Sequence, residues 1–163
     1  MNKIVVAAAL MLAAANLVAQ SQLEIGVVYY QDGSAFYPLK KSVARVGGRS
    51  TIAAQIPGSA ASIRLPAGQV PVFKVCGVDP TRYKLYPLKI VGRSRSIDIS
   101  KVRRLGGADV VLPQEEIPAT ITAAEPNCYS ITSKQPLLDG EYAVSPVDSN
   151  DVFDFGIGEP KKK

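Results

Sequence analysis

Turn-forming residues divide the chain after residue 20 into short stretches, and this spacing limits the fold more than any other feature. The sequence holds 12 prolines and 13 glycines, and Asp or Asn stands beside many of them. Between these breaks, β-branched and aromatic residues recur with the two-residue period of strands. No amphipathic helix of useful length follows residue 20. The spacing therefore predicts one all-β domain over residues 21–158, folded as an antiparallel sandwich or barrel.

Residues 1–20 have the features of a secretory signal peptide. Lys3 gives a positive start, and residues 4–15 form an apolar run. A helix needs about 20 apolar residues to cross a bilayer, so this run is too short to be a transmembrane segment. Cleavage is expected after Ala19 or Ser21, with Ala15 as an alternative, and a buried N-terminal helix is the competing interpretation. The segment predicts a secreted or periplasmic protein, and residues 159–163 are expected to form a flexible basic tail.

The last part of the chain predicts a β-hairpin that closes the fold. Its first arm covers residues 136–144, a polar loop follows, and its second arm covers residues 152–158. In the second arm, Phe153, Phe155 and Ile157 alternate with Asp154 and two glycines. This period predicts a strand with one face in the core and the other in water.

The two arms also carry a resemblance. The pattern Pro-Leu-Leu-x-Gly-Glu-Tyr-Ala at 136–143, followed by Val-Phe-Asp-Phe-Gly-Ile at 152–157, resembles the end of a group of small, uncharacterised, secreted bacterial proteins of Bacteroidetes-like origin. Residues 24–30, with Asp32-Gly33 and Pro38-Leu39 after them, are similar to the first hairpin of that group. The resemblance implies a secreted β fold and brings no activity with it.

The most basic stretch lies at residues 92–107, in a chain of net charge +5. Ile97 and Ile99 alternate there with polar residues, which predicts a strand with a charged outer face. An alternative is a polyanion-binding surface for an acidic partner such as a polysaccharide. We expect no specific nucleic-acid partner, because the stretch has no aromatic residue for base stacking. The candidate binding residues are Arg93, Arg95, Arg103 and Arg104.

A second candidate binding site is the loop between the two C-terminal arms. Asp148, Asn150 and Asp151 offer oxygen ligands. Their spacing does not match an EF-hand, which requires a central Gly and a closing Glu. The loop is therefore predicted to be a bare hairpin loop at the surface, without a metal.

The two cysteines, Cys76 and Cys128, both lie in apolar, strand-like sequence. Export would place them in an oxidising compartment, where a disulfide would stabilise the fold by roughly 4 kcal/mol. Two separate buried thiols remain an equal alternative.

The sequence offers little for catalysis. It contains no His, which excludes Ser-His and Cys-His nucleophilic pairs. Asp139 and Glu141 are expected to share one face of a strand, and such a pair could serve a carbohydrate-active hydrolase. Solvated turn acids are the competing interpretation, and the chain has no Trp to line a sugar cleft. We therefore expect no enzyme activity and no cofactor.

These observations predict a non-catalytic binding or structural protein of the bacterial cell envelope. Its partner would be an unknown protein or an envelope polysaccharide. The hydrolase and the polyanion-binding module remain the alternatives, and the oligomeric state stays open.

Overall fold

A computed structural model describes residues 23–48, 51–101, 110–111 and 115–160. This part of the chain is almost entirely β, with antiparallel sheets and one short 3₁₀ helix, η1 (Pro80–Arg82). The predicted fold class is confirmed. Within the described residues, no helix is long and apolar enough to cross a membrane. The predicted signal peptide, Arg103, Arg104 and the end of the basic tail lie outside the described residues.

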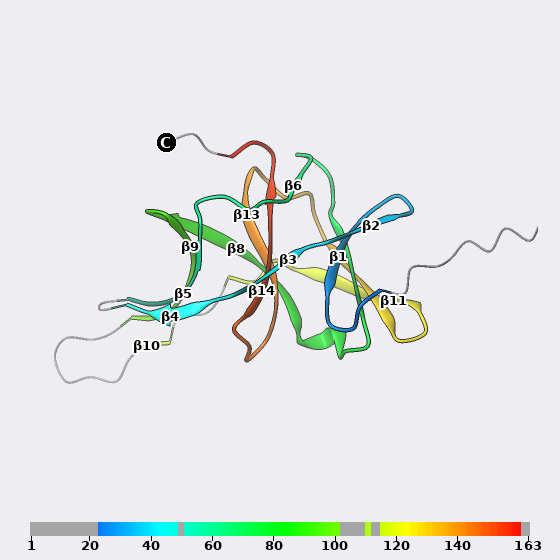
Figure 1. The fold of residues 1–163 in the computed structure, drawn as a ribbon, viewed down its shortest axis with the longest axis horizontal. Coiled ribbons are helices and arrows are strands. Elements are labelled where there is room, and N and C mark those ends of the chain that lie inside the picture. Colours follow the sequence, from blue (N-terminus) through cyan, green and yellow to red (C-terminus); the bar gives the residue numbers. More distant parts are fainter. Residues whose placement is uncertain (1–22, 49–50, 102–109, 112–114, 161–163) are drawn as a thin grey trace, which may run out of the picture.

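The strands form two sheets (Figure 1). The first has the order β11-β12-β7-β1-β2, with β11 (Ala119–Glu125), β12 (Cys128–Ser133), β7 (Val72–Cys76), β1 (Val28–Asp32) and β2 (Ala35–Pro38). The second has the order β3-β14-β13-β8-β9-β5-β4, with β3 (Lys40–Val43), β14 (Asp151–Ile157), β13 (Gly140–Pro146), β8 (Tyr83–Val91), β9 (Ser94–Lys101), β5 (Thr51–Pro57) and β4 (Arg45–Gly47). Two short strands join this second sheet at its sides, β10 (Val110–Val111) on β9 and β6 (Arg64–Leu65) on β14.

The second sheet curls into a nearly closed barrel. Its two end strands, β3 and β4, are consecutive in the chain and are separated by Ala44 alone. Residues 40–47 therefore pair with β14 at one edge of the sheet and with β5 at the other. Strand β8 bends in a similar way, since its first part pairs with β13 and its last residues pair with β9. Residues 40–47 and β8 each pair with two different strands along their length, and residues 40–47 join the two edges of the sheet.

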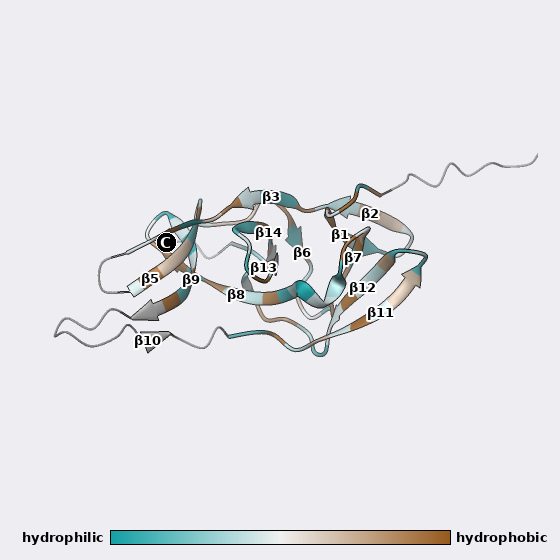
Figure 2. Cartoon of the chain, turned by 90° about the horizontal axis from the view of Figure 1, so that it is seen from below, coloured by the Kyte–Doolittle hydropathy of each residue, from teal (hydrophilic) through white to brown (hydrophobic). Residues whose placement is uncertain are grey.

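The first sheet packs against one side of this barrel. Figure 2 shows an elongated body, with β1, β2, β7, β11 and β12 at one end, β5 and β9 at the other, and β13 and β14 between them. The main apolar core lies between the first sheet and the outer face of β13 and β14. Its largest fully buried side chains include Phe73, Phe153, Phe155, Leu85 and Ile131. The rings of Phe73 and Phe155 lie 4.8 Å apart across this interface.

The C-terminal hairpin is confirmed, but the prediction that one face of its second arm meets water is wrong. Every residue from Val152 to Ile157 is buried. Phe153 and Phe155 face the sandwich core, and the alternate residues, including Asp154, face the barrel interior. The strand is covered on both sides because the sheet that contains it closes on itself.

The two cysteines form a disulfide, which decides between the two alternatives left open above. Cys76 on β7 and Cys128 on β12 are paired residues of neighbouring strands, with Cα atoms 4.1 Å apart and a sequence separation of 52. The bond ties together two central strands of the five-stranded sheet. The first hairpin is also present, with Gly33 at a φ of 57° in the turn between β1 and β2.

Candidate functional site

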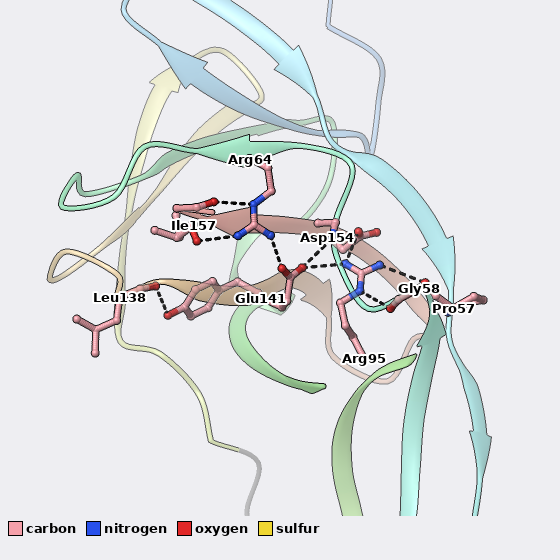
Figure 3. Close-up of polar contacts among 11 residues, drawn as sticks. Pro57, Gly58, Arg64, Arg95, Leu138, Glu141, Asp154 and Ile157 are labelled. Carbon is pink, nitrogen blue, oxygen red and sulfur yellow. Dashed lines mark hydrogen bonds and ion pairs between the residues drawn. The ribbon is translucent and has the colours of Figure 1, made fainter. Parts of the chain in front are cut away.

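The barrel contains a layer of buried charges, which Figure 3 shows from the side. Glu141 enters from β13, Asp154 from β14 and Arg95 from β9, and each is at most 4% exposed. Arg64 on β6 approaches the same group. Two cations thus face two anions, so the layer carries no net charge. Balanced pairing is what makes burial of such groups tolerable.

Glu141 lies at the centre of this layer. One carboxylate oxygen, Oε1, accepts a hydrogen bond from Nη1 of Arg64. The other, Oε2, accepts one from the backbone N–H of Ala61 at 2.7 Å and lies 3.5 Å from Nη1 of Arg95. Both oxygens are therefore engaged, and the carboxylate serves as a structural anchor between β13, β6 and the loop before β6.

All three side-chain nitrogens of Arg95 donate hydrogen bonds within the fold. Nη1 donates to Asp154 Oδ2 at 2.7 Å, Nε donates to the carbonyl of Gly58 at 3.0 Å, and Nη2 donates to the carbonyl of Pro57 at 3.3 Å. The second oxygen of Asp154 accepts a bond from Ser42 Oγ at 3.2 Å. This network connects four strands or loops through groups that are well separated in sequence.

The guanidinium of Arg64 packs against Gly156. Its Nε and Nη2 donate to the carbonyls of Gly158 and Ile157, both at 2.8 Å. A Cβ atom at Gly156 would lie 2.0 Å from Nη1 of Arg64 and 2.3 Å from its Cζ. Residue 156 must therefore lack a side chain for the guanidinium to reach Glu141.

Beyond the charge layer, the barrel interior becomes apolar. Ala44, Ile56, Ala143 and Val152 form a small second core there, with Ala54 and Leu88 packed against it. This core does not fill the barrel. A cavity of about 250 Å³ remains at the end of the barrel next to the loop of residues 147–150. We call this cavity the barrel mouth; its apolar lining comes from Ala44, Val46, Ala54, Tyr86, Ile97, Ile99 and Val152.

The rim of the barrel mouth is mainly polar and contains one acidic residue, Asp148. It is formed by residues 145–150, which include Asp148, Ser149 and Asn150. Asp148 holds a φ of 60° and is exposed, and within the described residues it makes no hydrogen bond or ion pair. Burial, together with the negative charges of Glu116 and Asp148, raises the pKa of Tyr86 to about 12. Tyr86 therefore stays a neutral phenol near the carboxylate of Asp148.

A second cavity, of about 370 Å³, opens beside the charge layer. Its charged lining residues are Arg64, Lys89, Glu141 and Glu159. Arg64 and Glu141 bind each other, and Lys89 pairs with Asp98 at 2.9 Å. Three of these four groups are thus already engaged, which leaves this cavity with little to offer a ligand.

The predicted basic site is only partly on the surface. Arg93 is exposed in the turn between β8 and β9. The placement of Arg95 on the charged outer face is wrong, because its side chain is 3% exposed and points into the barrel. Arg95 has the same strand parity as Ile97 and Ile99, which also line the interior. Binding by Arg93, Arg103 and Arg104 stays a prediction.

The predicted loop site lies at the barrel mouth. Asp148 and Asn150 are on its rim. Asp151 does not join them in a cluster, because it begins β14 and pairs with Lys41 at 2.7 Å. Among the described residues, no group of three acidic or Cys side chains is arranged to hold a metal ion.

The two candidate catalytic carboxylates lie in different environments. Strand β13 begins at Gly140, so Asp139 precedes the strand and is exposed, whereas Glu141 is buried. The expectation that the two share one strand face is wrong, and so is the view of Glu141 as a solvated turn acid. The sequence gives no sign that Arg64 and Arg95 are partners of Glu141, because residues 64, 95 and 141 share no local motif.

Comparison with known proteins adds no relative: the chain matches no protein-family model, no curated protein and no solved structure.

Proposed function

We propose that this is an exported, non-catalytic binding protein of the bacterial cell envelope, and that the barrel mouth is its ligand site. The observation that carries the proposal is the unfilled barrel mouth, with apolar walls and a polar rim, next to the loop of residues 147–150. Small barrels commonly hold a ligand at the mouth, and binding sites combine apolar walls with a few polar groups. Here the walls are aliphatic apart from Tyr86, and Asp148 supplies an unpaired charge at the rim.

The chemistry of the mouth indicates the kind of ligand. A volume of about 250 Å³ suits a short aliphatic or aromatic group. Asp148 at the rim favours a protonated amine or a hydroxyl donor on that group and disfavours a carboxylate. The ligand is therefore proposed to be a small amphiphile whose apolar end enters the barrel and whose cationic or donor end stays at the rim.

The occupied carboxylates support the non-catalytic part of the proposal. Glu141 accepts hydrogen bonds on both oxygens, and Asp154 does the same. A general acid or base needs a carboxyl group that is free to exchange a proton with a substrate. The signal-like residues 1–20 and the Cys76–Cys128 disulfide support export, since disulfides persist in oxidising compartments.

Three six-carbon probes with the same tail test the proposal by calorimetry at pH 7: hexylamine, 1-hexanol and hexanoate. We expect affinity to fall in that order. Asp148→Asn is expected to lower the affinity for hexylamine by up to about fivefold, the effect of losing an exposed ion pair. The affinity for 1-hexanol is expected to stay unchanged. Ala54→Leu fills the cavity and is expected to abolish binding of all three. Ala35→Leu, on exposed β2, is the matched control. Equal binding by wild type and Ala54→Leu would place the ligand elsewhere.

A further inference from the structure

Strand β11 is an end strand whose first six residues lack the charges and prolines found in the other end strands. It pairs with β12 on one side, and within the described residues no strand pairs with its other side. None of its seven residues is buried, and Ile121 is 36% exposed. Exposed strand edges invite pairing with another chain, and proteins usually block them with charges or Pro.

The other end strands do carry such blocks. Strand β2 ends in Pro38, β3 contains Lys40 and Lys41, and β4 begins with Arg45. Strand β11 reads Ala-Thr-Ile-Thr-Ala-Ala-Glu, so residues 119–124 contain neither charge nor Pro. Its one charge, Glu125, and a break in register between Ala123 and Glu125 lie at its C-terminal end, which leaves residues 119–123 regular. This contrast within one molecule marks β11 as the edge left open.

The backbone of β11 has its free hydrogen-bonding groups at alternate residues. The N–H of Lys134 donates to the carbonyl of Pro118 at 2.9 Å, and the strand register continues this ladder along β12. In an antiparallel ladder, hydrogen-bonded pairs alternate with pairs that point their groups away. Thr120 and Thr122 are therefore bonded to β12, and Ala119, Ile121 and Ala123 direct their N–H and C=O groups to the open edge.

We propose that two copies of this chain pair through their β11 strands, antiparallel and centred on Ile121. In this register Ile121 faces Ile121 of the second copy, and Ala119 faces Ala123. All the free groups named above then find partners, giving about six new backbone hydrogen bonds. Aliphatic residues meet aliphatic residues on one face, and Thr120 meets Thr122 on the other, which are favourable cross-strand pairs.

Glu125 and Glu116 have cationic partners within their own chain, and the exposed Lys134, which lines the groove beside β11, lies just after the end of β12. Glu125 is bound to Lys74 at 2.6 Å, and Glu116 lies 3.7 Å from Lys84, both within one chain. A groove of about 250 Å³ borders the core-facing side of β11 and is lined by Leu85, Ile117, Ala119 and Ile121. Ile121 of the second copy would lie over this groove. The pairing is independent of the ligand site at the barrel mouth.

Sedimentation velocity tests the proposal. The wild type is expected to show a reversible monomer–dimer equilibrium in the micromolar to millimolar range, because an edge of this length buries less than about 1,200 Å². Ile121→Lys and Ile121→Glu each set like charges against each other and are expected to be monomeric. An equimolar mixture of the two is expected to dimerise again, which a misfolded variant would not do. Val91→Lys, on an exposed hairpin end, is expected to match the wild type.

Three results overturn the proposal. The first is a wild type that stays monomeric at about 1 mM, a concentration at which a dimer with a dissociation constant of about 1 mM is already well populated. The second is a dimer that survives Ile121→Lys. The third is a mixture of the two charge variants that stays monomeric although each retains the circular dichroism spectrum and melting temperature of the wild type.

Discussion

Arg95 Nη1 lies 2.7 Å from Asp154 Oδ2 inside the barrel, and the two residues are 3% and 2% exposed. They belong to β9 and β14, which are not neighbours in the sheet, since β8 and β13 lie between them. The pair therefore spans the barrel interior rather than one sheet edge. Together with Glu141 and Arg64, it connects walls of the barrel that the backbone ladder connects only indirectly.

Removing one member of this layer is expected to destabilise the fold strongly. Arg95→Met leaves Asp154 buried without its cation and leaves the carbonyls of Pro57 and Gly58 unpaired. We expect the free energy of unfolding to fall by about 3–5 kcal/mol, measured by urea denaturation. Arg93→Met, two residues away on the surface, is the matched control and is expected to change it by less than about 0.5 kcal/mol. Equal effects of the two substitutions would contradict the role of Arg95.

Gly156 and Arg64 are expected to be energetically coupled. Gly156→Ala places a methyl group where the guanidinium lies, because its Cβ would be 2.0 Å from Arg64 Nη1. The arginine must move and release Glu141, at a cost of about 2–3 kcal/mol. In an Arg64→Ala background the same glycine substitution is expected to cost much less, giving a coupling energy of at least ~1 kcal/mol in a double-mutant cycle. If the two substitutions instead changed the free energy of unfolding additively, the contact with Arg64 would not be the reason that position 156 requires glycine.

Loss of the disulfide is expected to lower stability without changing the fold. Cys76 and Cys128 close a loop with a sequence separation of 52 and sit on adjacent paired strands. The Cys76→Ser/Cys128→Ser variant is expected to keep a β-rich circular dichroism spectrum and to lose about 2–4 kcal/mol of unfolding free energy. Reduction of the wild type with dithiothreitol is expected to give the same loss and two free thiols. A stability that does not respond to either treatment would contradict this expectation.

Alkaline pH is expected to unfold the protein partly through Tyr86. Burial raises the pKa of Tyr86 to about 12, so the folded state favours the neutral phenol. This contribution is complete below the unfolded-state pKa of about 10 and is lost as the pH rises toward 12. Between pH 10 and pH 12, the free energy of unfolding is expected to fall by about 2–3 kcal/mol more in the wild type than in Tyr86→Phe. The difference in tyrosinate absorbance between the two proteins gives the titration directly, and a midpoint near pH 10 would contradict it.

Local patterns predict the strands well and their surroundings less well. The alternation at residues 153–157 correctly identifies a strand, and Phe153 and Phe155 are in the core as expected. The same alternation assigns Asp154 to water, because a local pattern shows which residues share a face and not what covers that face. The cover comes from barrel closure by residues 40–47, which pair with segments far away in sequence.

For Arg95, the sequence does contain a sign that the side chain points into the barrel. Its parity matches that of Ile97 and Ile99, so the period of two places it inside the barrel with them. Its positive charge, by contrast, favours a position on the surface. Strand parity was the better guide because Glu141 and Asp154 supply the compensating charges, and their arrival from β13 and β14 depends on the tertiary fold. The barrel mouth likewise has no linear motif, because its lining comes from six separate strands.

The central claim is that the barrel mouth binds a small amphiphile, and a methyl NMR titration with hexylamine tests it most directly. The account predicts saturable shifts of the Ile97 and Ile99 methyl resonances, which line the mouth, and unchanged resonances for Ile131 and Ile157 in the sandwich core. Shifts confined to other residues, or none at any hexylamine concentration that leaves the protein folded, would contradict it.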